Sequence, residues 1–306
     1  HEIELRLSTL PTAFGEKLVM RVFDPDVLQR DFDQLGLKGQ DLARWREMTS
    51  RPNGIVLVTG PTGSGKTTTL YATLRALATE EVNVSTIEDP IEMVENSFNQ
   101  MQVQPAIDLG FADGIRALMR QDPDIIMVGE IRDLETAEMA VQAALTGHLV
   151  ISTLHTNDAP SAITRLLDLG VPAYLLQSTL IGVMAQRLTR TLCPACRQPD
   201  DSVTDEQWAA FVKPFKNVPK PAQIWRPVGC VACRMTGFRG RAGLYEILAN
   251  GEAIRSFITE RPELRRLRLA AIKHGMRPLR IAGAAAVAEG ITTIEEVLRH
   301  APPVEV

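Results

Sequence analysis

The sequence contains little cysteine, few aromatic residues and no long hydrophobic run. Only 4 of its 306 residues are cysteine, and 5% are aromatic. Four cysteines in a chain of this size are too few for a disulfide framework and are compatible with a reducing compartment. No apolar stretch approaches the roughly 18 residues that a membrane-spanning helix needs. These shortages exclude a disulfide scaffold and an integral membrane protein.

Neither sign of charge prevails in the sequence. It has 33 Lys+Arg against 37 Asp+Glu, for a formal net charge of -4, and 45% of its residues are hydrophobic. The overall charge gives no reason to bind a polyanion, so a nucleic-acid partner would need a local basic patch, and we expect none. The length predicts one large globular domain with smaller attachments and excludes a disordered or fibrous chain.

The hydrophobic pattern divides the chain into four parts. In residues 1–24, apolar and polar residues alternate on both sides of a turn, which predicts a β-hairpin. The absence of a starting Met indicates a fragment of a longer protein. From 54 to 186, apolar strand runs alternate with helical patterns, which predicts an α/β fold with a parallel sheet covered on both faces. The proline-rich segment after Leu192 predicts a small irregular subdomain that needs a cross-link, such as a bound metal ion, to be stable. We expect an N-terminal domain remnant and linker at 1–30, the α/β core at 31–191, the irregular subdomain at 192–240 and a helical part at 241–306.

A phosphate-binding motif follows the first strand run of the core. Residues 60–67 read GPTGSGKT and fit the P-loop pattern G-x-x-x-x-G-K-[ST] between a predicted strand and a predicted helix. Glycines let successive backbone N–H groups point at an anion, and the following helix adds its positive end. In this geometry Lys66 reaches the β- and γ-phosphates of a nucleotide, and Thr67 holds magnesium. The predicted nucleotide-binding residues are Gly60, Pro61, Thr62, Gly63, Ser64, Gly65, Lys66, Thr67 and Thr68, together with Glu88 after a later strand run.

Acidic residues follow two later strand runs. Glu130 comes after IIMVG, which is the layout of a Walker B strand without its usual Asp, and the acidic cluster Glu88 to Glu92 follows the run at 82–87. Open parallel sheets place ligands at these carboxyl ends, although an acidic loop is more often solvated surface. His155 ends a further strand run and is the better histidine candidate for sensing phosphate, whereas a lone histidine is more often structural. Together these groups have the chemistry for nucleotide hydrolysis.

The four motifs together resemble the secretion ATPase superfamily of type II secretion and type IV pilus assembly, in particular its type II branch, the GspE family. GPTGSGKTTT is similar to its Walker A motif, TIEDPIE to its aspartate box, RQDPDIIMVGEIRDLETA to its Walker B motif and TGHLVISTLHTND to its histidine box. The resemblance implies a RecA-like P-loop ATPase core preceded by a fragment of an N-terminal α+β domain. It implies Glu92 as general base, Glu130 as support for magnesium and water, and His155 as sensor of the γ-phosphate. It also implies that Arg6 and Arg21 of the hairpin move onto the nucleotide.

Two C-x-x-C pairs lie in the irregular subdomain. Cys193 and Cys196 form one pair, and Cys230 and Cys233 form the other, with 33 residues between the pairs. Four thiolates at this spacing predict a closed structural zinc site, which would supply the cross-link that the subdomain needs. A redox pair is the main rival interpretation. Within the superfamily, the resemblance implies such an element for the secretion and pilus-extension ATPases, but not for the retraction ATPases.

The subdomain is also basic. Residues 187–241 carry 10 Lys+Arg and 4 Asp+Glu. This asymmetry favours contact with anionic lipid or an acidic partner, although a solvated basic face is commoner. The GFRGR segment contains Arg239 and Arg241, and the resemblance places it near a subunit boundary, where either arginine would reach a neighbouring subunit's nucleotide. For four further arginines the sequence does not decide between pairing with a phosphate and pairing with a neighbouring acid: Arg116, Arg120, Arg132 and Arg165.

The sequence therefore predicts a cytoplasmic motor ATPase that powers pseudopilus assembly and protein export in type II secretion. The resemblance implies ATP with magnesium, a homo-hexamer, and a peripheral location at the inner membrane through a partner that binds the missing N-terminal domain. A type IV pilus extension ATPase is the alternative within the superfamily. Outside it stand a nucleic-acid motor, which would need a basic channel bearing aromatic residues, and a non-catalytic zinc-binding assembly module.

Overall fold

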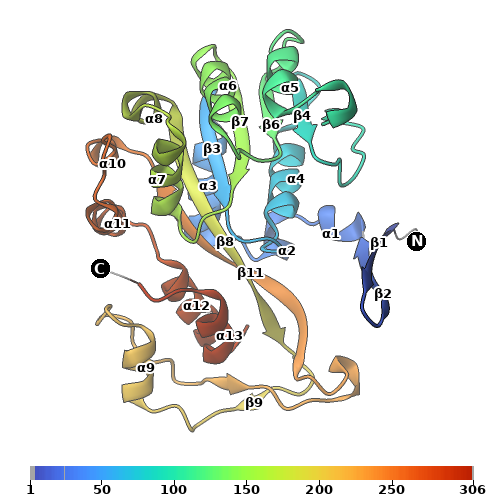
Figure 1. Cartoon of the computed structure of the whole chain (residues 1–306). Coiled ribbons are helices and arrows are strands. Elements are labelled where there is room, and N and C mark those ends of the chain that lie inside the picture. The colour runs from blue at the N-terminus through green and yellow to red at the C-terminus, as the bar shows by residue number, and fades with distance from the viewer. Residues whose placement is uncertain (1–3, 24, 305–306) are drawn as a thin grey trace.

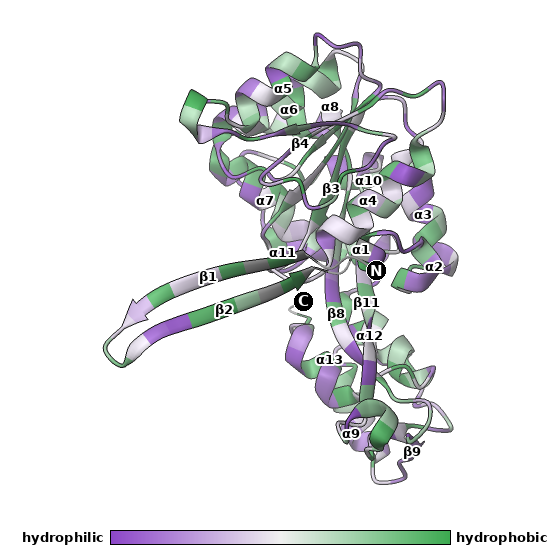
Figure 2. Cartoon of the chain, turned by 90° about the vertical axis from the view of Figure 1, so that its right-hand side faces the viewer, coloured by the Kyte–Doolittle hydropathy of each residue, from purple (hydrophilic) through white to green (hydrophobic). Residues whose placement is uncertain are grey.

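The structure, a computed structural model, describes residues 4–23 and 25–304. It begins with the strands β1 (Glu4–Thr12) and β2 (Gly15–Phe23), which pair antiparallel as the predicted hairpin. Figure 2 shows this hairpin projecting away from the rest of the chain. One of its faces is apolar and exposed: Leu7 is 61% exposed, and Met20, its partner across the ladder, is 53% exposed.

The core is a seven-stranded sheet in the order β11-β8-β3-β7-β6-β4-β5. Its six strands from β8 to β5 run parallel, and β11 pairs antiparallel with β8 at one edge. Every residue of β3, β4, β6 and β7 is buried, as is typical of parallel strands covered on both faces. The strands are β3 (Gly54–Thr59), β4 (Val84–Glu88), β5 (Asn99–Gln102), β6 (Ile125–Val128), β7 (Leu149–Leu154), β8 (Leu180–Leu192) and β11 (Phe238–Ala249).

Different helices cover the two faces of the sheet (Figure 1). Because side chains alternate along a strand, Ile55 and Leu57 of β3 pack with one set of helices, whereas Val56 and Val58 pack with the other. The first set contains α5 (Phe111–Leu118), α6 (Leu134–Leu145), α7 (Ala159–Leu169) and α8 (Ala173–Thr179). The second set contains α2 (Phe32–Leu35), α3 (Gly39–Thr49) and α4 (Lys66–Leu77), and α1 (Pro25–Leu28) links it to the hairpin. The predicted α/β architecture is confirmed.

The irregular subdomain is an excursion between two long strands. Strands β8 and β11 continue below the main sheet in Figure 1, and the chain between them folds at their far ends. Its apolar residues include Trp208 and Phe211, whose rings meet edge to face with 5.5 Å between centroids and which join the large hydrophobic core of the chain. The elements of this excursion are β9 (Gln198–Pro199), α9 (Asp205–Phe211), β10 (Trp225–Arg226) and the 3-10 turn η2 (Val231–Cys233); a further 3-10 turn, η1 (Pro105–Ile107), follows β5.

The expectation of a helical part from residue 241 is wrong for its first nine residues. Residues 241–249 belong to β11, which returns to the main sheet, because their register with β8 buries Leu244, Ile247 and Leu248. The sequence pattern of one strand cannot show a partner that lies fifty residues away. Helical structure begins at α10 (Glu252–Arg255) and continues through α11 (Leu264–Lys273), α12 (Leu279–Ala288) and α13 (Ile294–His300).

Candidate functional site

The glycine-rich loop between β3 and α4 is braced by β8. Gly60 and Gly65 have φ angles of +156° and +87°, which other residues rarely adopt. A Cβ on Gly60 would lie 2.5 Å from the carbonyl oxygen of Gln186, and a Cβ on Gly65 would lie 2.9 Å from Gln186 Nε2. The hydroxyl of Thr69 donates to Gln186 Oε1 at 2.8 Å. Gln186 therefore holds the loop and the start of α4, a role that no sequence motif signals.

Lys66 begins α4 and is buried beneath the loop. Its Nζ donates to the carbonyl oxygens of Gly60 at 2.9 Å and Pro61 at 3.2 Å. Burial lowers the pKa of Lys66, and the negative charge of Glu130 opposes that shift. Ser64 Oγ is buried in the same loop and has no hydrogen-bond partner among the described residues. The Lys66 cation at the start of a 12-residue helix, directly after a glycine-rich loop, fits a bound phosphate.

Glu88, at the end of β4, is held by three donors. Tyr71 Oη donates to its Oε2 at 2.7 Å, while Thr86 Oγ1 and Gln100 Nε2 donate to its Oε1 at 2.7 and 3.1 Å. Burial and the Glu88 charge raise the pKa of Tyr71, so the phenol stays a donor. With both oxygens hydrogen-bonded, this carboxylate is suited to fixing the start of the loop that carries Glu92.

Glu130, His155 and Arg132 form a cluster beyond the ends of β6 and β7. Arg132 Nη2 donates to Glu130 Oε1 at 2.5 Å, and His155 Nε2 lies 3.4 Å from Glu130 Oε2. Burial alone would raise the pKa of Glu130, but Arg132, His155 and Lys66 together hold it below its usual value. Burial and the charge of Lys66 lower the pKa of His155, and the negative charge of Glu130 opposes this shift. The cluster thus pairs an ionised carboxylate with a neutral imidazole at neutral pH.

These groups line one cavity of 1420 Å³. It brings together the loop, the acidic cluster after β4 and the ends of β6 and β7, so all four predicted catalytic residues meet there. Gly60, Pro61 and Ser64 belong to the loop but do not line the cavity. The predicted residues on its wall are Thr62, Gly63, Gly65, Lys66, Thr67, Thr68, Glu88, Glu92, Glu130 and His155.

The arginines separate into two groups. Arg132 and Arg241 line this cavity, so Arg241 reaches the site of its own chain, across the ladder from β8. Arg116 instead pairs on the surface with Asp113 at 2.6 Å. Arg120, Arg165 and Arg239 are exposed, and none of them is on the cavity wall. The sequence did not decide whether Arg132 pairs with a phosphate or with an acid, and in the structure it pairs with Glu130.

The hairpin approaches the mouth of the cavity. Val22 of β2 lines it, as do Leu28 and Arg30 of the linker. The backbones of Arg6 and Arg21 face one another across the ladder, whereas their side chains lie outside the described residues. The expected approach of these two arginines to a nucleotide therefore stays a prediction.

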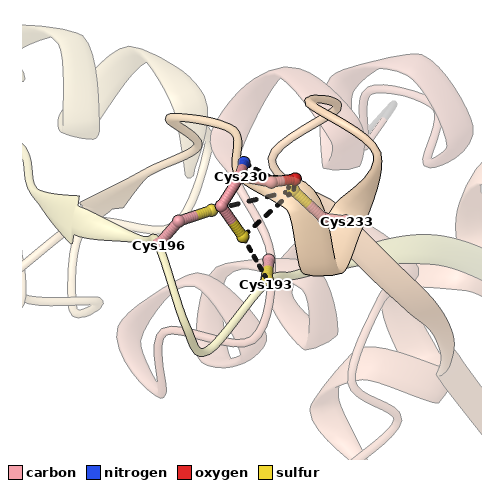
Figure 3. A group of neighbouring side chains, drawn as sticks. All are labelled: Cys193, Cys196, Cys230 and Cys233. Atoms are coloured by element: carbon pink, nitrogen blue, oxygen red, sulfur yellow. Dashed lines mark hydrogen bonds between the residues drawn. The ribbon is translucent and has the colours of Figure 1, made fainter.

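The four cysteines meet at the far ends of β8 and β11 (Figure 3). Their sulfurs lie within 4.8 Å of one another, and three of the Sγ–Sγ separations are 3.8 to 3.9 Å. With zinc–sulfur bonds of about 2.3 Å, the edges of a tetrahedral zinc site measure about 3.8 Å. Gly237 N donates to Cys233 Sγ at 3.2 Å and Gly229 N to Cys196 Sγ at 3.3 Å, which favours the thiolate form. The cluster fits a tetrahedral metal ion.

A family model described as type II/IV secretion system protein matches residues 1–299. The chain belongs to this family. It is 61% identical over 301 residues to the type IV pilus assembly ATPase TfpB of Acinetobacter baylyi, covering 98% of this chain and 51% of the relative. It is 46% identical over 297 residues to the type II secretion system ATPase E of Vibrio cholerae, covering 97% and 58%. It is also 46% identical over 303 residues to the type IV pilus assembly ATPase PilB of Myxococcus xanthus, covering 99% and 53%.

Solved structures show the same family fold. The pilus retraction motor PilT, crystallised with bound ADP, superposes with a TM-score of 0.69 at 29% identity and covers 98% of this chain and 74% of that one. The ATPase DotB of Legionella pneumophila gives a TM-score of 0.67 at 24% identity, over 96% and 71%. The chain spans little more than half the length of these curated family relatives, between 51% and 58% of each. Among the helices of residues 4–23 and 25–304, none combines the length and apolar character needed to cross a bilayer.

Proposed function

We propose that this chain binds ATP in the cavity between the glycine-rich loop and the ends of β4, β6 and β7, and hydrolyses it to ADP and phosphate. The convergence of Lys66, Glu92, Glu130 and His155 on one cavity carries this proposal. The loop amides and Lys66 would hold the β- and γ-phosphates. A magnesium ion on Thr67 would neutralise charge that develops on those phosphates.

The carboxylates divide the remaining work. Glu92 would be the general base that orients the attacking water, since it lines the cavity four residues after the Glu88 anchor. Glu130 stays ionised and would hold water next to the magnesium ion. His155 lines the cavity in contact with Glu130 and would sense the γ-phosphate there.

We further propose that the four cysteines hold a structural zinc ion. The sulfur separations support this assignment, and so do the N–H donors that point at the sulfurs. With all four ligands supplied by the protein, the ion would have no open position for chemistry. Its effect would be to fix the cysteine-bearing end of the excursion between β8 and β11.

As the biological role we favour assembly of a type IV pilus. The sequence alone favoured the type II secretion branch, but identity is 61% to the pilus assembly ATPase of A. baylyi and 46% to the type II ATPase of V. cholerae. The retraction branch is less similar, with 29% identity to the PilT structure. Following the family resemblance, the whole protein would be a homo-hexamer in the cytoplasm, held at the inner membrane by a partner that binds an N-terminal domain. Nucleotide binding would close that domain over the cavity, and hydrolysis would reopen it.

Phosphate release in magnesium and ATP tests the enzymatic proposal. Lys66→Ala should abolish turnover, whereas Lys38→Ala, an exposed lysine outside the cavity, should leave it unchanged. Equal turnover in the two variants would refute hydrolysis at this cavity. The biological role is tested in a strain that lacks the gene: loss of surface pili with normal protein export supports the pilus assignment, and the reverse result supports type II secretion.

A further inference from the structure

The turn between Pro227 and Gly237 presents apolar side chains to solvent. We call this segment, with η2 at its centre, the cysteine knuckle. Val231 is 90% exposed, Met235 is 69% exposed and Val228 is 47% exposed. The knuckle lies at the end of the molecule that is far from α5 and α6, beyond the last pairs of the β8–β11 ladder (Figure 1). These three side chains play no part in the nucleotide cavity.

The backbone holds these side chains outward at some conformational cost. Arg234 and Met235 have φ angles of 52° and 62°, a region where glycine or asparagine is usual. The turn is fixed beneath them, because Cys230 N donates to Cys233 Sγ at 3.1 Å and Met235 N donates to the carbonyl oxygen of Cys230 at 2.9 Å. The apolar tip is therefore part of a rigid turn, so that little conformational entropy would be lost when it is buried against a partner.

The surroundings of the tip are uniformly basic in sequence. Between Glu206 and Glu246 there is no Asp or Glu, whereas there are 7 Lys+Arg. Arg234 and Arg239 of this stretch are exposed. Arg226 is also exposed but lies near Asp200, which it helps to keep ionised. The apolar side chains thus stand beside positive charges that no neighbouring acid in sequence offsets.

We propose that the cysteine knuckle docks on an anionic lipid bilayer, with Val228, Val231 and Met235 entering the interface and Arg234 and Arg239 contacting lipid phosphates. A projecting aliphatic tip beside cations matches a fluid surface that is apolar inside and negative outside. Protein interfaces instead rely on Trp, Tyr and Arg that fill shaped pockets, and the tip has no aromatic side chain. Docking here leaves the nucleotide cavity free, so the inference is independent of the proposed hydrolysis.

Sedimentation with vesicles tests the docking. We expect the zinc-loaded chain to sediment with vesicles of roughly 30% phosphatidylglycerol in phosphatidylethanolamine, and not with phosphatidylcholine vesicles. Val231→Ser with Met235→Ser should weaken binding by about tenfold or more, because each buried apolar side chain contributes about this much. Arg234→Gln with Arg239→Gln should weaken it by about tenfold as well.

Matched control variants distinguish binding through the cysteine knuckle from nonspecific adsorption to vesicles. Ile107→Ser with Leu145→Ser removes exposed apolar groups elsewhere, and Arg255→Gln with Arg265→Gln removes two exposed charges elsewhere. Both control variants should bind as the unmodified chain does, and all variants should keep their zinc content and melting temperature. Failure to sediment with anionic vesicles would overturn the proposal and direct attention to an acidic protein partner. Unchanged binding in the knuckle variants, or an equal loss in the controls, would overturn it too.

Discussion

His155 Nε2 lies 3.4 Å from Glu130 Oε2, so the ends of β7 and β6 meet in a direct contact on the cavity wall. Arg132 occupies the other carboxylate oxygen. Both the His155 and Glu130 side chains line the cavity in which the γ-phosphate would lie. Any change in the charge of this cluster should alter the response of hydrolysis to pH.

Arg132→Ala is expected to move the acid limb of the pH–rate profile to higher pH. Arg132 lowers the pKa of Glu130 against burial, which raises it, and Arg132 also lowers the pKa of His155. Without the guanidinium both pKa values rise, so both groups take up protons at a higher pH than before. Profiles of kcat/KM against pH measure the shift. Arg116→Ala, which removes a surface arginine, should leave the profile in place, and an unmoved limb in Arg132→Ala would contradict this account.

Glu92→Gln should keep ATP binding and lose turnover by roughly 100-fold or more, because an amide cannot accept the proton of the attacking water. Single-turnover phosphate release and nucleotide binding, measured together, separate the two effects. Glu138→Gln on the exposed side of α6 is the matched control. Normal turnover in Glu92→Gln would transfer the role of base to Glu130.

Much of this site is local in sequence. The loop at 60–67, its strand and its helix follow from one motif, and the carboxyl ends of parallel strands bring Glu92, Glu130 and His155 to the same edge. Gln186 and Arg241 could not be predicted in this way. They reach the cavity because β8 and β11 pair over a long register, and pairing between distant strands leaves no periodic signal in either one.

The capping pattern at Thr293 shows the same limit. Thr293 and Glu296 have the T-x-x-E spacing of a capping box at the start of a helix, and Thr293 Oγ1 accepts the backbone N–H of Glu296 at 3.3 Å. The Glu296 carboxylate is instead buried against β8, where Arg190 Nη2 donates to it at 2.6 Å. A local motif thus locates the start of α13, while tertiary contacts decide which partners the Glu296 carboxylate binds.

Removal of zinc should loosen the subdomain without unfolding the core. The chain is expected to contain about one zinc ion, and Cys230→Ser should lower that content and the melting temperature of the excursion. Metal analysis and hydrogen exchange of residues 193–237 check this, with Ser202→Ala, a surface change in the same excursion, as control. A chain that folds with full protection in excess chelator and without bound metal would contradict the structural role.

Glu246→Ala should destabilise the fold by about 3 kcal/mol, because it leaves two buried N–H groups without acceptors. Glu246 is buried on β11, where its Oε1 accepts Ala159 N at 2.8 Å and its Oε2 accepts Leu279 N at 3.1 Å. Those amides begin α7 and α12, so one carboxylate caps two helices. Chemical denaturation measures the loss, and Glu252→Ala on the surface should cost little. Equal stability of the two variants would show that the caps are dispensable.

Titration calorimetry with magnesium and ATP tests the central claim most directly, namely that the loop ahead of Lys66 holds a nucleoside triphosphate. The account predicts saturable binding of one ATP per chain, lost in Lys66→Ala and retained in Lys38→Ala. Both variants should keep the melting temperature of the unmodified chain without nucleotide. Absence of binding by the well-folded chain, or equal binding by Lys66→Ala, would contradict the account.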